Sequence, residues 1–188
     1  MNFSEDLDTV YISLGSDCAV AYNLKKLKLS SYTFPFDWAK INNIDSIQNI
    51  LENDFSNFFD NIKLKKINSY KFINFDHNEI SKISIILENG IILPHECTDV
   101  YNEDIFKEKY TRRINRFREI VINNKIKKIF VRADDKQIDL NKLKNILDNY
   151  NCLNYKLITI DYSHYKCVDN FTWQREYIAW DKLFLLNI

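Results

Sequence analysis

The order of apolar patterns in the second half of the chain constrains the fold most strongly. Residues from about 103 to 123 carry apolar side chains at helical spacing, which predicts a long amphipathic helix. Residues 128–132 form an apolar run typical of a buried strand, 138–150 again has helical spacing, and 156–160 is a second apolar run. Because parallel neighbouring strands need a crossover that is usually a helix, this order predicts a parallel sheet.

The chain begins with a similar unit. Residues 10–14 alternate as a buried strand would, and Gly15 permits a tight turn after them. Ser16 or Asp17 can then cap a helix that runs from about residue 18 to residue 28. The opening segment therefore predicts a further strand and helix of the same α/β domain.

The middle of the chain has shorter patterns. Residues 43–53 have the spacing of an amphipathic helix, and Asp37, in the aromatic loop, is a candidate cap for the helix after that loop. Asn89-Gly90 separates two apolar runs, 83–87 and 91–93, which is a strong β-hairpin signal. We therefore predict a three-layer α/β fold, with a mostly parallel sheet flanked by helices and a β-hairpin insertion.

Composition limits the class of protein. A chain of 188 residues with 46% hydrophobic content and no internal repeat or linker suits a single domain over residues 1–188. Lys and Arg number 26 and Asp and Glu also number 26, so no overall field attracts nucleic acid, and no nucleic-acid partner is expected. The chain lacks a signal-like start and an apolar run of about 18 residues, so we expect a cytoplasmic protein without a membrane partner.

The cysteines do not indicate a metal site or a disulfide framework. They stand at positions 18, 97, 152 and 167, without a CxxC pair, and reduced thiols are the expectation for an intracellular chain. His95, Glu96, Cys97 and Asp99 form a local cluster, but adjacent loop residues seldom converge on one ion. We therefore expect no metal and no cofactor.

Ligands of an open α/β sheet normally bind beyond the carboxyl ends of its strands. In the predicted sheet these ends are residues 15–18, 132–135 and 161–164. Cys18 would lie in the first turn of a helix, where unpaired backbone amides and the helix dipole favour thiolate over thiol. The pattern suggests that Cys18 is a nucleophile. Nearby backbone amides would then hold the oxyanion that forms on the substrate carbonyl. The alternative is that Cys18 is an inert core residue.

A cysteine nucleophile needs a base, and three histidines are available. His95 is the best placed, because it follows the second hairpin strand and Pro94 stiffens its loop. His77 lies in an equally polar loop, and His164 follows the last clear strand, where it can orient a substrate. For each of them, an ordinary surface or loop histidine remains the alternative.

Arg132 ends an apolar strand at the predicted ligand edge. A guanidinium there must either meet a carboxylate, such as Asp37 or Asp134, or bind an anionic substrate. On the long helix, Arg113 or Arg116 can meet an anionic group in the same way, although arginines on such a helix often form only a solvated face.

Five segments occur in an order that resembles a family of uncharacterised proteins described as papain-like cysteine peptidases. They are Ser13–Cys18, Phe34–Trp38, Leu93–Glu96, Tyr110–Phe117 and Ile129–Arg132. The resemblance, which extends to the tail around Trp180, implies Cys18 as nucleophile and His95 as base. It also implies a papain-like α+β fold as the alternative architecture. Glu96 and Cys97 depart from the family's usual Asp and aromatic residue after the histidine.

The leading hypothesis is a thiol-dependent hydrolase or acyltransferase with an unknown small-molecule or peptide substrate. Asp134 is the predicted third catalytic residue, with Asp37 and Asp161 as alternatives, because it follows the histidine in the chain and ends a strand. The candidate substrate-binding residues are Gly15, Ser16, Asp37, Trp38, Arg113 and Arg132. The competing hypotheses are a non-catalytic module that binds a sugar or phosphate-bearing ligand through Trp38, Arg113 and Arg132, and a protein similar to Gly-Asp-Ser-type esterases. The sequence does not indicate an oligomeric state.

Overall fold

The computed structural model describes residues 9–67, 82–94, 96, 101–134, 140–164, 175 and 178–185. The elements along the chain are β1 (Thr9–Ser13), α1 (Cys18–Lys26), α2 (Ile44–Glu52), β2 (Lys63–Ile67), β3 (Lys82–Ile86), β4 (Ile92–Leu93), α3 (Glu103–Ile122), β5 (Lys127–Asp134), α4 (Asn141–Asn149), β6 (Tyr155–Asp161), a 3-10 turn at Tyr162–His164, and α5 (Trp180–Leu185). Helices and strands alternate in the second half of the chain, as its apolar pattern predicts.

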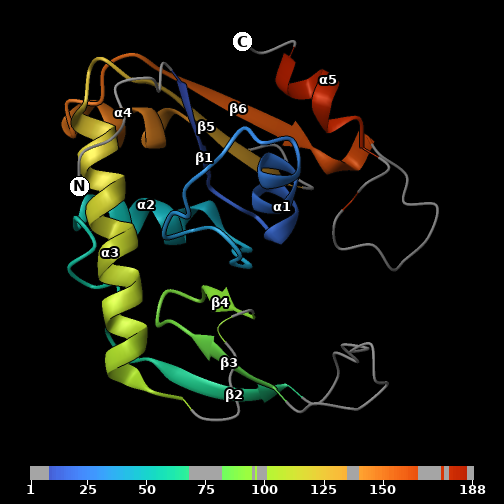
Figure 1. The fold of residues 1–188 in the computed structure, drawn as a ribbon. Coiled ribbons are helices and arrows are strands. Elements are labelled where there is room, and N and C mark those ends of the chain that lie inside the picture. The colour runs from blue at the N-terminus through green and yellow to red at the C-terminus, as the bar shows by residue number, and fades with distance from the viewer. Residues whose placement is uncertain are drawn as a thin grey trace.

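Three strands form a parallel sheet in the order β1-β5-β6 (Figure 1). Ser13 of β1 aligns with Val131 of β5, and Arg132 of β5 aligns with Thr159 of β6. The carboxyl ends of the three strands therefore lie at one edge, which confirms the predicted parallel sheet. Cys18, at the start of α1, follows this edge directly.

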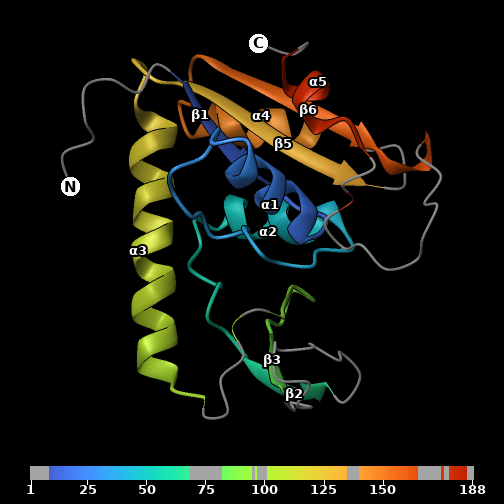
Figure 2. The same ribbon diagram turned by 45° about the vertical axis from the view of Figure 1, so that its right-hand side comes forward.

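The other three strands form a separate antiparallel sheet in the order β2-β3-β4. Ile85 pairs with Leu93 across the hairpin, and Gly90 takes the positive φ of +75° that its turn requires. Figure 2 shows this sheet beside the first turns of α3, at the end of the molecule opposite the parallel sheet. The fold is thus mixed α/β, but the hairpin belongs to a second sheet rather than to a simple insertion. An antiparallel sheet is also what the papain-like alternative requires.

Successive side chains of a strand point to opposite faces of a sheet, and both faces of this parallel sheet are buried. On one face, Tyr11 and Val131 pack with residues of α1 and α5, including Phe184. On the other face, Ile12 and Phe130 pack with residues of α2, α3 and α4. This two-sided burial explains why the middle of β5, Ile129 to Val131, is an uninterrupted apolar run.

The core on the α3 side also includes the antiparallel sheet. Ile85 and Leu93 belong to the same buried cluster as Ile12 of β1. Aromatic rings connect the layers, with Phe58 stacked on Tyr110 at a centroid distance of 5.3 Å. Continuous packing therefore fixes β4 relative to β1.

Among the helices that the structure describes, none has both the length and the apolar character needed to cross a membrane.

Candidate active site

The turn between β1 and α1 places Cys18 at the start of a helix. Gly15 has a φ of +80°, and a Cβ added there would meet Arg132 Nη1 and Ile41 Cδ1, each at 3.4 Å. Asp17 caps α1, because its Oδ1 accepts a hydrogen bond of 2.9 Å from the Ala19 amide. The capped turn makes Cys18 the first residue of α1, as expected from the sequence.

Arg132 joins the ends of three segments under this turn. Its side chain is 1% exposed and donates hydrogen bonds to the carbonyls of Leu14 (2.8 Å) and Ile41 (3.1 Å) and to Asp134 Oδ2 (2.6 Å). Of the two interpretations of Arg132, these contacts agree with the carboxylate partner, which is Asp134 rather than Asp37. Arg132 and Asp134 thus form an internal ion pair at the ligand edge of the sheet.

A chain of backbone hydrogen bonds connects the cysteine turn to the antiparallel sheet. The Ile41 amide donates to the Ser16 carbonyl at 2.6 Å, and Lys40 exchanges two hydrogen bonds with Ile92 of β4, at 2.8 and 3.0 Å. His95 comes three residues after Ile92. His95 lies outside the described residues, as do His77, Cys97, Asp99 and Cys167 and the imidazole of His164.

Glu96, the residue after His95, is held by three side chains of α3. Lys109 Nζ lies 2.6 Å from Glu96 Oε2, the Tyr110 hydroxyl donates to Oε1 at 3.1 Å, and Arg113 Nη1 lies 3.4 Å from Oε1. The Arg113 guanidinium also lies 4.6 Å from the centroid of the Tyr110 ring. Two segments of the family-like pattern, around residues 93–96 and 110–117, therefore meet at one carboxylate. The sequence assigns no such role to Glu96.

Asp37 is buried inside its own turn. Its Oδ2 accepts a hydrogen bond of 2.9 Å from the Phe34 amide, while α2 is capped by Asn43, so the prediction that Asp37 caps the following helix is wrong. The reason is that the Phe34–Asp37 turn uses the carboxylate to satisfy a buried amide. Burial raises the pKa of Asp37 to about 7, although the Phe34 amide and the charge of Arg113 oppose the rise.

Trp38 and the 34–37 turn face the end of α1. Lys25 Nζ lies 5.5 Å from the centroid of the Trp38 ring, within the range of a cation–π interaction. Lys25 also donates to the Thr33 hydroxyl at 3.0 Å. The aromatic loop is therefore attached to the helix that carries Cys18.

The Cys18 thiol is not activated by the helix terminus in the way that the sequence predicts. The residue is 8% exposed, and burial raises the pKa of the thiol to about 12. The negative charge of Asp17 adds to the rise, and the amide of Cys18 lowers the pKa by less. Desolvation therefore outweighs the helix terminus, and the thiol is neutral near pH 7.

The Asp17 carboxylate is bound by residues from the far end of the chain. Arg175 Nε lies 3.0 Å from Asp17 Oδ2, and the Tyr162 hydroxyl donates to Oδ1 at 3.2 Å. The Arg175 guanidinium stacks 3.8 Å from the centroid of the Tyr162 ring. No local pattern in the sequence predicts these contacts, because Asp17 and Arg175 are 158 positions apart.

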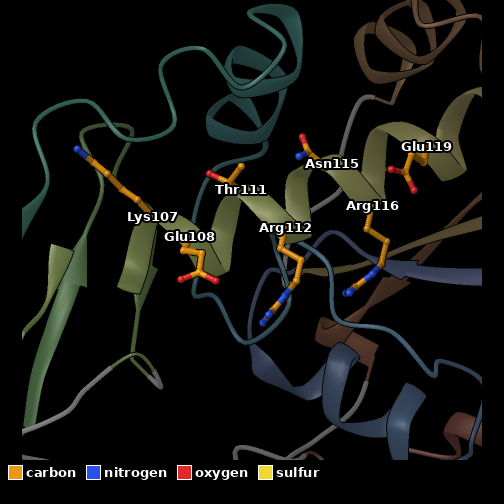
Figure 3. A pocket seen from close by; sticks show the side chains of 7 residues that line it. All are labelled: Lys107, Glu108, Thr111, Arg112, Asn115, Arg116 and Glu119. Carbon is orange, nitrogen blue, oxygen red and sulfur yellow. The ribbon is translucent and has the colours of Figure 1, made fainter. Parts of the chain in front are cut away.

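Other candidate features lie away from Cys18. Cys152 and Cys18 are free thiols, and the described residues contain no group of three or more side chains suited to a metal ion. A groove of about 480 Å³ runs along the outer face of α3, where Figure 3 shows Arg112 and Arg116 on the same side of the helix. None of the candidate site residues lines this groove.

Comparison with known proteins agrees with the resemblance in the sequence. Residues 9–164 match the family described as "Putative papain-like cysteine peptidase (DUF1796)". The uncharacterized protein R408 of Acanthamoeba polyphaga mimivirus is 32% identical over 172 residues, which cover 80% of this chain and 77% of the relative. No solved structure gives a significant match. With residues 9–164 matched, the chain belongs to the family that carries this description.

Proposed function

We propose that the protein is a thiol-dependent hydrolase or acyltransferase in which Cys18 is the nucleophile and His95 is the general base. The observation that carries the proposal is the position of Cys18 in the first turn of α1, beside the carboxyl ends of the parallel strands. Membership of a family described as cysteine peptidases supports the same chemistry.

The neutral thiol makes a base necessary. Because burial raises the pKa of Cys18 to about 12, the thiolate forms only when a neighbouring group accepts the proton. A histidine accepts protons near neutral pH. His95 is favoured because backbone hydrogen bonds connect the strand before it to the cysteine turn. Ile92, three residues before His95, is hydrogen-bonded to Lys40, and the next residue, Ile41, is hydrogen-bonded to Ser16. Three residues of extended chain span at most about 10 Å, so in this proposal His95 reaches the cysteine turn from β4.

Backbone amides next to the thiol are proposed to hold the oxyanion. The amides of Gly15 and Ser16 already donate to Ser13 Oγ (3.3 Å) and the Ala133 carbonyl (2.8 Å). The amides of Asp17 and Cys18 donate to no other described residue. We therefore propose these two amides, rather than all the amides near the turn, as the donors to the oxyanion.

The proposed reaction follows from these positions. The Cys18 sulfur bonds to the acyl carbon while His95 takes the thiol proton, and the bond to the leaving group breaks as His95 returns the proton to that group. Water or an amine then attacks the thioester, releases the acyl group and restores the thiol. The substrate class is a peptide or a small acyl compound.

Asp134 is proposed as the carboxylate that orients His95. It ends β5 at the ligand edge, and its Oδ2 is fixed by Arg132. In this proposal Arg132 and Arg113 position internal carboxylates, and Gly15 and Ser16 shape the turn.

We also infer the architecture that supports this site. Helices pack on both faces of the parallel sheet, which favours three layers, and the core shared with the antiparallel sheet favours a single domain.

The test compares Cys18→Ser with Cys152→Ser, which removes the other buried free thiol among the described residues. Hydrolysis of p-nitrophenyl acetate and of an unstructured peptide is followed at pH 7.5. We expect activity to fall by about 10³-fold or more in Cys18→Ser and to be retained in Cys152→Ser. Equal activity of the wild type and Cys18→Ser would contradict the proposal.

A second candidate function is a non-catalytic binding module. The raised pKa of the buried Cys18 thiol favours it, since an inert core cysteine has this character. If the protein is such a module, Cys18→Ser should leave its biological activity unchanged.

A further inference from the structure

We infer that Arg175 is a positioning residue for Cys18 and that it acts through the carboxylate of Asp17. The inference rests on the proposed role of Cys18 as nucleophile. It assigns a function in the site to the C-terminal part of the chain, which is distant from Cys18 in sequence.

Asp17 is held on both of its oxygens. Oδ1 accepts from the Ala19 amide at 2.9 Å and from the Tyr162 hydroxyl at 3.2 Å, while Arg175 Nε lies 3.0 Å from Oδ2. The three donors come from α1, from the turn after β6 and from the C-terminal part of the chain. A carboxylate with partners on both oxygens has little rotational freedom, so Asp17 stays at the helix terminus next to Cys18.

Arg175 is itself fixed by neighbouring aromatic residues. Its guanidinium lies 3.8 Å from the centroid of the Tyr162 ring, and its carbonyl accepts a hydrogen bond of 2.8 Å from Trp180 Nε1 of α5. Tyr162 and Trp180 in turn meet edge to face, with ring centroids 6.3 Å apart. Arg175 is therefore a preorganised cation and not a freely moving surface side chain.

The placement of this cation has an electrostatic consequence for the thiol. The Asp17 charge raises the pKa of Cys18, and a fixed guanidinium beside Asp17 offsets part of that field. From β5, Arg132 also interacts electrostatically with Asp17, but the carboxylate that it contacts directly is Asp134. From the 3-10 turn after β6, Tyr162 contributes a hydroxyl that donates a hydrogen bond to Asp17. Arg175 is thus the cation in direct contact with the carboxylate next to the nucleophile.

The experiment measures the pH profile of Cys18 alkylation by iodoacetamide, with the modified peptide quantified by mass spectrometry. The variants are Asp17→Asn, Arg175→Gln, Arg175→Lys and the double variant Asp17→Asn with Arg175→Gln. Arg118→Gln is the matched control, because Arg118 Nε of α3 lies 2.9 Å from Asp54 Oδ1 and the Arg118 side chain is about as exposed as that of Arg175. The unfolding midpoint of each variant is measured in parallel.

Asp17→Asn keeps an amide oxygen for the helix cap but removes the charge. We expect it to accelerate alkylation at pH 8 by about threefold to tenfold, since one pKa unit changes the thiolate fraction tenfold. Arg175→Gln is expected to slow alkylation by about threefold or more, and Arg175→Lys to slow it less. In the Asp17→Asn background, Arg175→Gln should change the rate by less than about twofold, because the coupling between the two sites is then lost.

The inference is overturned if Arg175→Gln and Arg118→Gln give the same pH profile, if Arg175→Gln acts equally with and without Asp17→Asn, or if Cys18 is not alkylated at any pH up to about 10. Alkylation needs no substrate, so these outcomes are separate from the hydrolysis assay. Loss of the proposed function would appear as hydrolysis that Cys18→Ser does not impair, whatever the alkylation profiles show.

Discussion

Arg132 Nη2 lies 2.6 Å from Asp134 Oδ2, and the two side chains are buried together at the carboxyl end of β5. The same guanidinium binds the carbonyls of Leu14 and Ile41. This one side chain therefore holds the end of β1, the segment after Trp38 and the end of β5 at fixed separations. The cysteine turn depends on it for its shape.

Replacement of Arg132 by Met should lower the free energy of unfolding by about 3–5 kcal/mol, because Asp134 is left buried without its counter-charge. The double variant Arg132→Met with Asp134→Asn should lose less, since the unpaired charge is then absent. Urea unfolding of both variants checks the prediction. A double variant less stable than Arg132→Met would show that the ion pair is not the source of the loss.

The stability of the protein should depend on the ionisation of Asp37. Its pKa is about 7 in the folded state and about 4 in an unfolded chain, so between these values the folded state holds a proton that the unfolded chain has lost. The free energy of unfolding should therefore fall as the pH rises from about 4 to about 7, by up to about 4 kcal/mol, and then level off. Asp37→Asn should remove this slope, as urea unfolding at successive pH values will test. A slope that persists unchanged in Asp37→Asn would assign it to another group.

The contacts between Glu96 and the side chains of α3 should contribute to both stability and activity. Glu96→Gln weakens the contacts with Lys109 and Arg113, and we expect it to cost about 1–3 kcal/mol. Glu103→Gln is the control, because the Glu103–Lys107 pair at 2.6 Å is exposed to solvent and should contribute far less to stability. Because His95 directly precedes Glu96 in the chain, Glu96→Gln should also lower kcat while leaving the rate of Cys18 alkylation unchanged. Equal losses of stability and of kcat in Glu96→Gln and Glu103→Gln would contradict this role of Glu96.

The regular elements were largely predictable from the sequence. The helix expected over 103–123 is α3, and the apolar runs at 128–132 and 156–160 are β5 and β6. Apolar spacing reports local burial, and a helix or strand is defined locally, so periodicity is sufficient for these elements. The hairpin at Asn89-Gly90 was predictable for the same reason, since its turn needs a residue with positive φ.

The contacts of the candidate site were only partly predictable. The position of Cys18 follows from a local strand–turn–helix pattern, but its raised pKa depends on burial by residues from other elements. The sequence of β2 is rich in lysine and has no apolar alternation, so local propensity does not predict a strand there. The segment is a strand because it pairs with β3. The Asp17–Arg175 pair joins distant segments, and sequence spacing carries no signal for such a contact.

The central claim is that Cys18 forms an acyl-enzyme with His95 as base, and mass spectrometry of the protein quenched during turnover of p-nitrophenyl acetate tests it most directly. The account predicts an acetyl group on the peptide that contains Cys18. This adduct should be absent in Cys18→Ala, should form far more slowly in His95→Gln, and should form at the normal rate in Cys152→Ala. Turnover without an adduct on Cys18, or with the acetyl group on Cys152, would contradict the account.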